Sequence, residues 1–107
     1  MIVEIVSFNL PADTGRAEAL ALYRQTASKW VVNPDLIQKF YMYDQERGIG
    51  GGVYFWRSRE AIALWHGDDY RAMVRERYGT EPRIEIFEVA MHVEPGTAKI
   101  SEFEEPV

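Results

Sequence analysis

The sequence has no cysteine among its 107 residues. This absence excludes disulfides, thiolate nucleophiles and zinc sites built on cysteine. The sequence also lacks any run approaching the roughly 20 apolar residues of a membrane-spanning helix, and no charged leader precedes an apolar stretch at its start. We therefore expect a soluble, cytoplasmic protein with no membrane partner.

An excess of positive charge is also missing, because the formal net charge is −5. Proteins that bind nucleic acids normally gather Lys and Arg on one surface to displace counterions. Arginines do gather in the second half of the chain, but Glu60, Asp68, Asp69 and Glu76 are interleaved with them. This alternation favours a solvated helix face, and no nucleic-acid partner is expected.

The chain has enough apolar material for one core, with 47% apolar and 13% aromatic residues. Its length fits a single domain. We predict a folded domain over residues 1–95, followed by an acidic tail over residues 96–107 that has too little core to fold alone.

The first half of the chain predicts a strand, a helix and a second strand. Residues 1–10 are rich in β-branched side chains and apolar on both alternating faces, so this strand should be covered on both sides. Asp13 is a candidate N-cap for a helix that runs to about Lys29. The buried stripe of this helix is predicted to be Leu20, Tyr23, Ala27 and Trp30. Residues 36–44 form the next strand.

The second half repeats the pattern of strand, helix and strand. Residues 45–48 predict a turn, and residues 53–56 a strand that pairs with the previous one in a hairpin. The glycines at positions 50–52 enter a strand, so they indicate a bulge or a close backbone approach and not a phosphate loop. Ser58 should cap a short helix that ends at Gly67, and Asp68 or Asp69 should begin another that ends at Gly79. A last strand is expected over residues 83–93.

This order of elements predicts the ferredoxin-like βαββαβ fold, an α+β arrangement in which a four-stranded antiparallel sheet carries its helices on one face. The strands are apolar on the other face too. A second copy of the chain is the simplest cover for that face, so we expect a homodimer through the open face of the sheet.

The stretch GGVYFWRSREAIALW, residues 51–65, resembles the third strand and second helix of the dimeric α+β barrel superfamily. The resemblance is strongest to small bacterial monooxygenases related to the antibiotic-biosynthesis monooxygenases, in which a later strand reads much like IEIFEV, and it covers about residues 2–94. Members include cofactor-free quinone-forming monooxygenases, haem-degrading oxygenases, polyketide cyclases and lactone isomerases. The resemblance implies a pocket between the helices and the sheet of one protomer.

Only some of the residues of these relatives are matched. Trp56 corresponds to a strand tryptophan that helps to hold an aromatic substrate in the cofactor-free oxygenases, but Gly52 and Ile62 replace their asparagine and tyrosine. In the haem-degrading branch, Trp65 corresponds to a helix tryptophan and Asn9 to an asparagine at the end of the first strand. The haem-ligating histidine is replaced by Arg75 or a neighbour.

The residues themselves offer few candidates for catalysis. His66 is the natural acid or base, because imidazole titrates near neutrality; alternatively, it interacts with the free carbonyls at a helix end. His92 is expected to be structural. No metal site is expected, since the aspartates near His66 look like helix caps, and no nucleophile triad or strained G-x-S-x-G turn is present.

The aromatic residues suit either a core or a pocket for a flat ligand. We assign His66 and Asn9 as catalytic residues and Trp56, Trp65, Tyr43 and Tyr70 as substrate-binding residues. The leading hypothesis is a cofactor-independent monooxygenase that acts on a small aromatic or polyketide-like compound, without a metal. The alternatives are a non-enzymatic dimeric protein that binds a small ligand and, third, a haem-degrading oxygenase.

Overall fold

The structure is a computed structural model and describes residues 1–104. Its elements follow one another in the order β1 (Ile2–Asn9), α1 (Arg16–Val31), β2 (Leu36–Asp44), β3 (Ile49–Trp56), α2 (Arg59–Trp65), α3 (Asp68–Tyr78), β4 (Arg83–Glu88), β5 (Met91–Glu94) and β6 (Lys99–Glu102).

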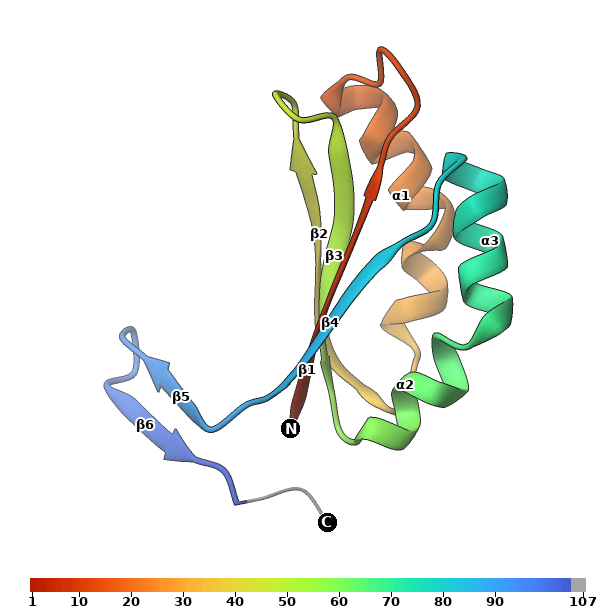
Figure 1. The fold of residues 1–107 in the computed structure, drawn as a ribbon. Coiled ribbons are helices and arrows are strands. Elements are labelled where there is room, and N and C mark those ends of the chain that lie inside the picture. Colours follow the sequence, from red (N-terminus) through yellow and green to blue (C-terminus); the bar gives the residue numbers. More distant parts are fainter. Residues whose placement is uncertain (105–107) are drawn as a thin grey trace.

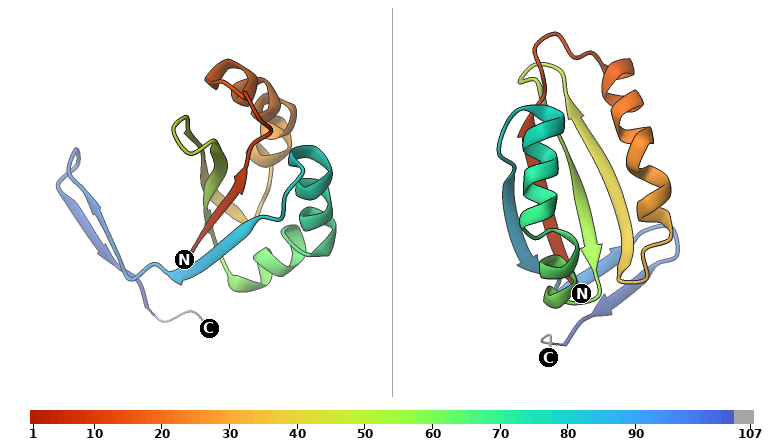
Figure 2. Two further views of the ribbon diagram at one scale, coloured as in Figure 1. Left: turned by 45° about the horizontal axis from the view of Figure 1, so that its top comes forward. Right: turned by 90° about the vertical axis from the view of Figure 1, so that its right-hand side faces the viewer.

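The main sheet has the strand order β2-β3-β1-β4, and every neighbouring pair is antiparallel. The three helices cover one face of this sheet and leave the other face open (Figure 1, Figure 2). The predicted ferredoxin-like α+β fold is thereby confirmed. The two helical segments expected between the third and fourth strands are present as α2 and α3, which meet at Gly67.

Strand β1 is central to the sheet and decides which side chains face the helices. Its even-numbered residues, from Ile2 to Phe8, are buried under the helices, whereas Val3 and Ile5 point to the open face. The alternation follows from the period of two along a strand. Because β1 pairs with β3 on one side and β4 on the other, its inward side chains lie at the middle of the core.

The glycines of β3 permit a close approach between strands and helix. Gly51 has a φ of +149°, and a Cβ at this position would lie 1.9 Å from the carbonyl oxygen of Val6. The register of β3 against β1 is nevertheless continuous, so the predicted close approach is present without a bulge in this pair. As a result β3 begins at Ile49, earlier than the expected position 53.

Helix α1 begins later than predicted. Gly15 occupies the N-cap position, and Asp13 lies outside the helix with a φ of 63°. The Tyr23 hydroxyl donates to the Met42 carbonyl at 2.7 Å and accepts from the Gly51 amide at 3.2 Å, which ties the helix to β2 and β3.

The buried side of α1 is also rotated relative to the prediction. Ala19, Tyr23 and Trp30 are buried, whereas Leu20 is 38% exposed and Ala27 is exposed. Leu20 and Ala27, which were expected to be buried, each lie one residue after a buried or half-buried position, Ala19 and Thr26. The stripe is therefore carried by the large aromatic side chains and not by the aliphatic ones.

The predicted helix ends are largely confirmed. The Ser58 hydroxyl accepts from the Ala61 amide at 3.3 Å, as an N-cap side chain does. Helix α3 begins at Asp68 and ends at Gly79, which adopts the left-handed conformation that favours glycine. Gly67 lies between α2 and α3 and is the N-cap of α3, so it separates two helices that meet at an angle.

The C-terminal region differs from the prediction. The expected strand over residues 83–93 divides into β4 and β5, and β5 pairs with β6 in a hairpin that includes most of the predicted tail. This hairpin projects from the main sheet on the side opposite to the helices (Figure 1, Figure 2). Its apolar side chains Met91, Val93 and Ile100 are more than half exposed.

The open face of the main sheet is apolar, as predicted. The side chains that the strand register places on it include Val3, Ile5, Phe40, Val53, Phe55 and Phe87. Phe40 and Phe87 are 57% and 50% exposed. The same register also places Gln38, Arg83 and Glu85 on this face, so its centre is apolar and polar residues lie on the edge strands β2 and β4. Soluble proteins usually cover an apolar surface of this kind.

Replacement of Gly51 tests the close approach of β3 to β1. Gly51→Ala should lower the free energy of unfolding by about 3 kcal/mol or more, because the methyl group would overlap the β1 backbone and the backbone angle is unfavourable. Gly96→Ala, at a turn position where an added Cβ would meet no atom within 4 Å, is the control and should change stability by less than about 0.5 kcal/mol. Urea denaturation measures both, and equal effects would contradict this role of Gly51.

Candidate functional site

A carboxylate lies at the centre of the core. The alternation of β1 places Glu4 between Ile2 and Val6 on the helix-covered face, where the residue is 0% exposed. Removal of a carboxylate from water costs several kcal/mol unless partners replace the lost hydration. Glu4 therefore needs hydrogen-bond donors inside the core.

Two side chains supply those donors. The Nδ1 atom of His66 lies 2.6 Å from the Oε1 atom of Glu4, and the indole Nε1 of Trp56 donates to the same oxygen at 2.9 Å. Trp56 comes from the end of β3, whereas His66 follows the last turn of α2. The His66 amide donates to the Ile62 carbonyl at 2.7 Å, so the backbone holds this position while the side chain points into the core.

The Glu4 carboxylate determines the tautomer of His66. An imidazole that donates from Nδ1 to a carboxylate keeps a lone pair on Nε2. Neither Nε2 of His66 nor Oε2 of Glu4 has a hydrogen-bond partner among residues 1–104, and both are buried. Burial lowers the pKa of His66 below its usual value of 6.5, although Glu4 opposes this shift. The imidazole is therefore neutral at pH 7, with a free lone pair.

Four aromatic rings pack against the imidazole of His66. The Tyr70 ring stacks on it with centroids 3.7 Å apart, and Tyr54 meets it edge-on at 4.4 Å. Trp30 and Trp56 add two further edge contacts at 5.2 and 5.3 Å. We call these four rings the aromatic box. They come from α1, β3 and α3, so the packing of all three elements determines the position of His66.

A small cavity lies next to this box, between α1 and α3 and above the sheet. Its volume is about 20 Å³, enough for roughly one water molecule. Trp30, Tyr54 and Tyr70 of the box contribute to its lining, together with Tyr78. Burial raises the pKa of Tyr54 and of Tyr70 well above 10 and that of Tyr78 to about 12. These phenols are protonated at neutral pH.

A larger groove adjoins the cavity at the edge of the sheet, where the end of α1 faces β2. Its volume is about 340 Å³, within the range of pockets that hold small organic ligands. Trp30, Lys39 and Tyr41 line both the cavity and the groove, so they form the partition between them. The Lys39 amine lies 3.8 Å from the centroid of the Tyr41 ring.

The predicted site residues are divided between different places. His66, Trp56 and Tyr70 lie together, as described above. Trp65 donates from Nε1 to the Asp35 carboxylate at 2.9 Å, and Tyr43 donates to the Thr14 carbonyl at 3.1 Å. Of the predicted site residues, Tyr70 alone lines the cavity and none lines the groove; His66 lies behind the cavity wall formed by Trp30, Tyr54 and Tyr70.

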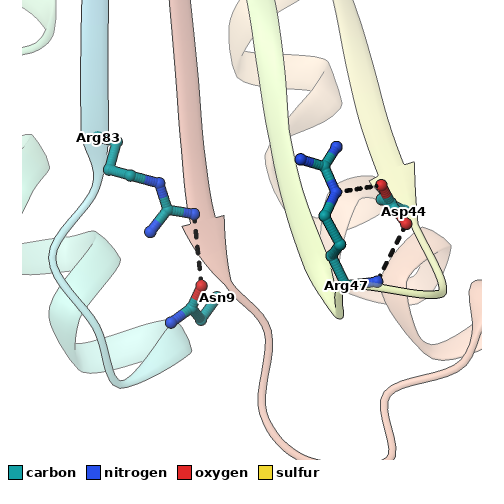
Figure 3. Close-up of polar contacts among 4 residues, drawn as sticks. All are labelled: Asn9, Asp44, Arg47 and Arg83. Atoms are coloured by element: carbon teal, nitrogen blue, oxygen red, sulfur yellow. Dashed lines mark hydrogen bonds and ion pairs between the residues drawn. The ribbon is translucent and has the colours of Figure 1, made fainter.

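Asn9 lies at the exposed end of β1, five residues from Glu4 and thus about 16 Å along the strand. Its Oδ1 atom accepts from Arg83 at 3.3 Å, beside the Asp44–Arg47 pair of the neighbouring strand end (Figure 3). This arrangement gives Asn9 a local structural partner and no contact with His66. His92 is exposed on β5, outside the core.

Sequence reasoning missed Glu4, Lys39 and Tyr54. The sequence did contain a signal for Glu4. It is an even-numbered residue of the strand, like Ile2, Val6 and Phe8, and therefore points to the same face. A single charged residue in a strand that is apolar on both faces is expected to be buried. Lys39 follows the same logic on β2, but the register shift between Leu36 and Gln38 obscures which face it occupies.

The surroundings of His66 in this form do not fit a haem. A porphyrin requires a pocket of hundreds of Å³, whereas the cavity next to the aromatic box has about 20 Å³ and His66 lines neither this cavity nor the groove. Within residues 1–104, no group of three or more His, Cys, Asp or Glu side chains is arranged to hold a metal ion. No helix in the same range is long and apolar enough to cross a membrane.

Comparison with known proteins identifies the fold. No protein-family model and no curated protein sequence matches the chain. Among solved structures, an antibiotic biosynthesis monooxygenase matches with a TM-score of 0.63 and 16% identity, over 83% of this chain and 98% of that chain.

Two further structures carry ligands. A monooxygenase from the gene ActVA-Orf6 of Streptomyces coelicolor, in complex with nanaomycin D, has a TM-score of 0.64 and 17% identity over 88% of this chain and 91% of that chain. A MhuD variant with two manganese protoporphyrin IX molecules per active site has a TM-score of 0.65 and 20% identity, over 88% of this chain and 99% of that chain. The resemblance seen in the sequence is thus confirmed in the fold, and the activity must be argued from the site.

The buried imidazole should make stability depend on pH. Because the folded-state pKa of His66 is lowered, the unfolded chain binds this proton first as pH falls below about 6.5. The free energy of unfolding of the wild type, minus that of His66→Gln, should stay constant above about pH 7.5 and decrease below pH 6.5, by up to about 1.4 kcal/mol per pH unit. Urea denaturation at a series of pH values measures this difference.

The matched control is His92→Gln, which removes the other histidine from an exposed position. A difference between wild type and His66→Gln that grows as the pH falls would show that the folded protein favours the imidazolium. That outcome would contradict a neutral His66 with a free lone pair.

Proposed function

We propose that the protein is a cofactor-independent monooxygenase that acts on a small aromatic compound, with His66 as the general base. One observation carries the proposal: the Glu4 carboxylate orients the imidazole through Nδ1 and leaves Nε2 buried and without a partner. Carboxylates hold the histidine base in this way in many enzymes. The fold shared with solved monooxygenase structures is consistent with this reading.

The chemistry requires only the substrate, O₂ and a base. Nε2 of His66 takes the proton of a phenol, and the phenolate then transfers electrons to O₂ so that a carbon–oxygen bond forms at the para carbon. The imidazolium returns the proton to the peroxide. Loss of the para hydrogen as a proton and cleavage of the O–O bond then release water and leave a quinone, so that one phenol and one O₂ give one quinone and one water.

The lowered pKa of His66 limits the class of substrate. A base transfers protons best when its pKa is close to that of the group it deprotonates. Since burial keeps the pKa of His66 below 6.5, an ordinary phenol with a pKa near 10 is poorly matched. A phenol conjugated with a carbonyl group, as in aromatic polyketides, is more acidic and better matched.

The small cavity implies that the reactive form is more open than this one. A volume of about 20 Å³ admits O₂ or water but no aromatic ring. Entry of a substrate requires α1 and α3 to separate, or side chains such as Met73 and Lys39 on the cavity wall to move. The adjoining groove of about 340 Å³ can hold the ring before it reaches His66.

The same closed cavity favours a second candidate function, a non-enzymatic protein that binds a small aromatic ligand in the groove. Trp30 and Tyr41 offer aromatic faces there, and Leu36 and Ile37 offer apolar contact. In this case the Glu4–His66 pair has a structural role in the core.

We also propose that the protein is a homodimer through the open face of the sheet. The support is the apolar side chains of that face, including Phe40 and Phe87, each at least half exposed in the single chain. The hairpin of β5 and β6 projects on the same side and exposes Val93 and Ile100, so it can reach a second copy (Figure 1).

Oxygen uptake tests the proposed activity. Purified protein should consume O₂ with carbonyl-conjugated phenols, and the rate should hold through pH 6.5 and fall only at lower pH, because burial lowers the pKa of His66 below 6.5. Glu4→Gln and His66→Asn should reduce turnover at least about tenfold, since general-base catalysis contributes about 10² to 10⁴. An oxygen electrode and product detection by mass spectrometry measure the rates.

His92→Asn is the control and should retain wild-type turnover, because this histidine lies outside the core. Circular dichroism must show that each variant is folded. If the protein binds the phenols but consumes no O₂, and Glu4→Gln binds them with the same affinity, the ligand-binding alternative is supported. That result would exclude His66 as a catalytic base for this substrate class.

Sedimentation tests the dimer. The wild type should sediment at twice the 12.4 kDa mass of the chain, and Phe40→Asp should give a monomer because it places a charge in the apolar interface. Leu64→Asp, at a 70% exposed position on α2, is the matched control and should remain dimeric. A monomeric wild type, or dissociation by both variants alike, would contradict the interface.

A further inference from the structure

The Lys39 amine occupies an unusual position for a lysine. Its Nζ atom lies 3.8 Å from the centroid of the Tyr41 ring, 4.4 Å from that of Tyr54 and 4.7 Å from that of Trp30. The strand register explains this position, because Lys39 pairs with Tyr54 and shares its helix-covered face. Lysines normally keep the amine in water, whereas this one is half-buried among aromatic rings.

No carboxylate neutralises this amine. Among residues 1–104, no Asp or Glu lies within ion-pair distance of Lys39, and the Glu4 carboxylate is already bonded to Trp56 and His66. A second cation is close, since the Lys29 amine lies 4.9 Å from the centroid of Trp30. The amine therefore has a hydrophobic surrounding and a like charge nearby.

These surroundings favour the neutral amine. Burial, with a smaller contribution from the like charge of Lys29, lowers the pKa of Lys39 to about 7, and Glu4 opposes the shift. The other ionisable groups around it are the phenols of Tyr41 and Tyr54, which are protonated at this pH, and the imidazole of His66. The aromatic faces attract the ammonium form, which opposes the effect of burial.

The Lys39 side chain also borders a space that can hold a ligand. Lys39 lines the groove of about 340 Å³ between α1 and β2, where the other lining side chains are mainly apolar or aromatic. Ala27, Val31, Leu36 and Ile37 provide the apolar wall. A flat apolar molecule in this groove would place its functional group beside a lysine amine in a largely dry environment.

We propose that Lys39 is a nucleophilic amine that condenses with aromatic aldehydes or ketones bound in this groove. A neutral lysine amine that has lost its water shell is the usual nucleophile for carbonyl groups. The nitrogen attacks the carbonyl carbon, a C=N bond forms, and the carbonyl oxygen leaves as water with the two amine protons. The product is a neutral imine, and no oxidant or reductant takes part. This site is independent of the proposed oxygenase activity.

The chain offers its own controls, because Lys29, Lys39 and Lys99 are its only lysines. Lys29 and Lys99 are exposed. The protein is incubated with benzaldehyde and sodium cyanoborohydride, which reduces an imine to a stable amine, and peptide mapping by mass spectrometry locates the adduct. At pH 7 Lys39 should be labelled at least about tenfold faster than Lys29 or Lys99.

The pH dependence and one pair of variants complete the test. Labelling of Lys39 should rise through pH 7 and level off near pH 8, whereas free Nα-acetyl-lysine should continue to rise towards its pKa near 10.4. Lys39→Arg should abolish the fast labelling. In Lys29→Arg, Lys39 should be labelled at a rate comparable to that in the wild type.

Labelling of Lys39 in the wild type at the same rate as Lys29 and Lys99 would overturn the proposal, and this comparison does not depend on any variant being folded. A rate for Lys39 that follows free acetyl-lysine across the pH range would also overturn it. The two proposals can fail separately. If Lys39 is labelled fast but the protein consumes no O₂ with the phenols, the amine site is supported and the oxygenase proposal is contradicted.

Discussion

The burial of the Glu4 carboxylate is the constraint on which the centre of this structure depends. A carboxylate with 0% exposure is tolerated only if donors replace water. Trp56 and His66 both bond to its Oε1 atom, one from the end of β3 and one from the end of α2. The pairing of β3 with β1 and the sharp change of direction between α2 and α3 at Gly67 are thus linked to the same oxygen atom.

A row of side chains across three strands explains how both charged groups are accommodated. Tyr54 is the partner of Glu4 on β1 and of Lys39 on β2 in the antiparallel register. The tyrosine ring therefore separates the carboxylate from the amine, and the two charges do not form an ion pair. In a direct ion pair, Glu4 and Lys39 would satisfy each other, and neither would be left to interact with His66 or with a ligand. Separated by the ring, the carboxylate orients His66, and the amine remains beside the groove.

The fold could be predicted from the sequence because its determinants are local and repeated. Strand alternation, the Ser58 cap and the left-handed Gly79 each carry their signal in a few neighbouring residues. The site was harder, because it depends on which distant residues meet. His66 was recognised as a candidate, but its partner Glu4 is 62 residues away. The division of the last strand into β4 and β5 was missed because residues 83–93 are continuously compatible with a strand, and only the pairing of β5 with β6 separates them.

The same comparison shows why fold and chemistry must be argued separately here. Structures with 16 to 20% identity share the layout of helices and sheet, which hydrophobic patterning alone can maintain. A neutral imidazole with a free Nε2 requires specific residues at positions 4, 56 and 66. Without the Glu4 carboxylate, nothing would fix the tautomer of His66, and the Trp56 indole would lose its acceptor. The proposed role of His66 as a base therefore depends on one charged residue, Glu4, at the centre of β1.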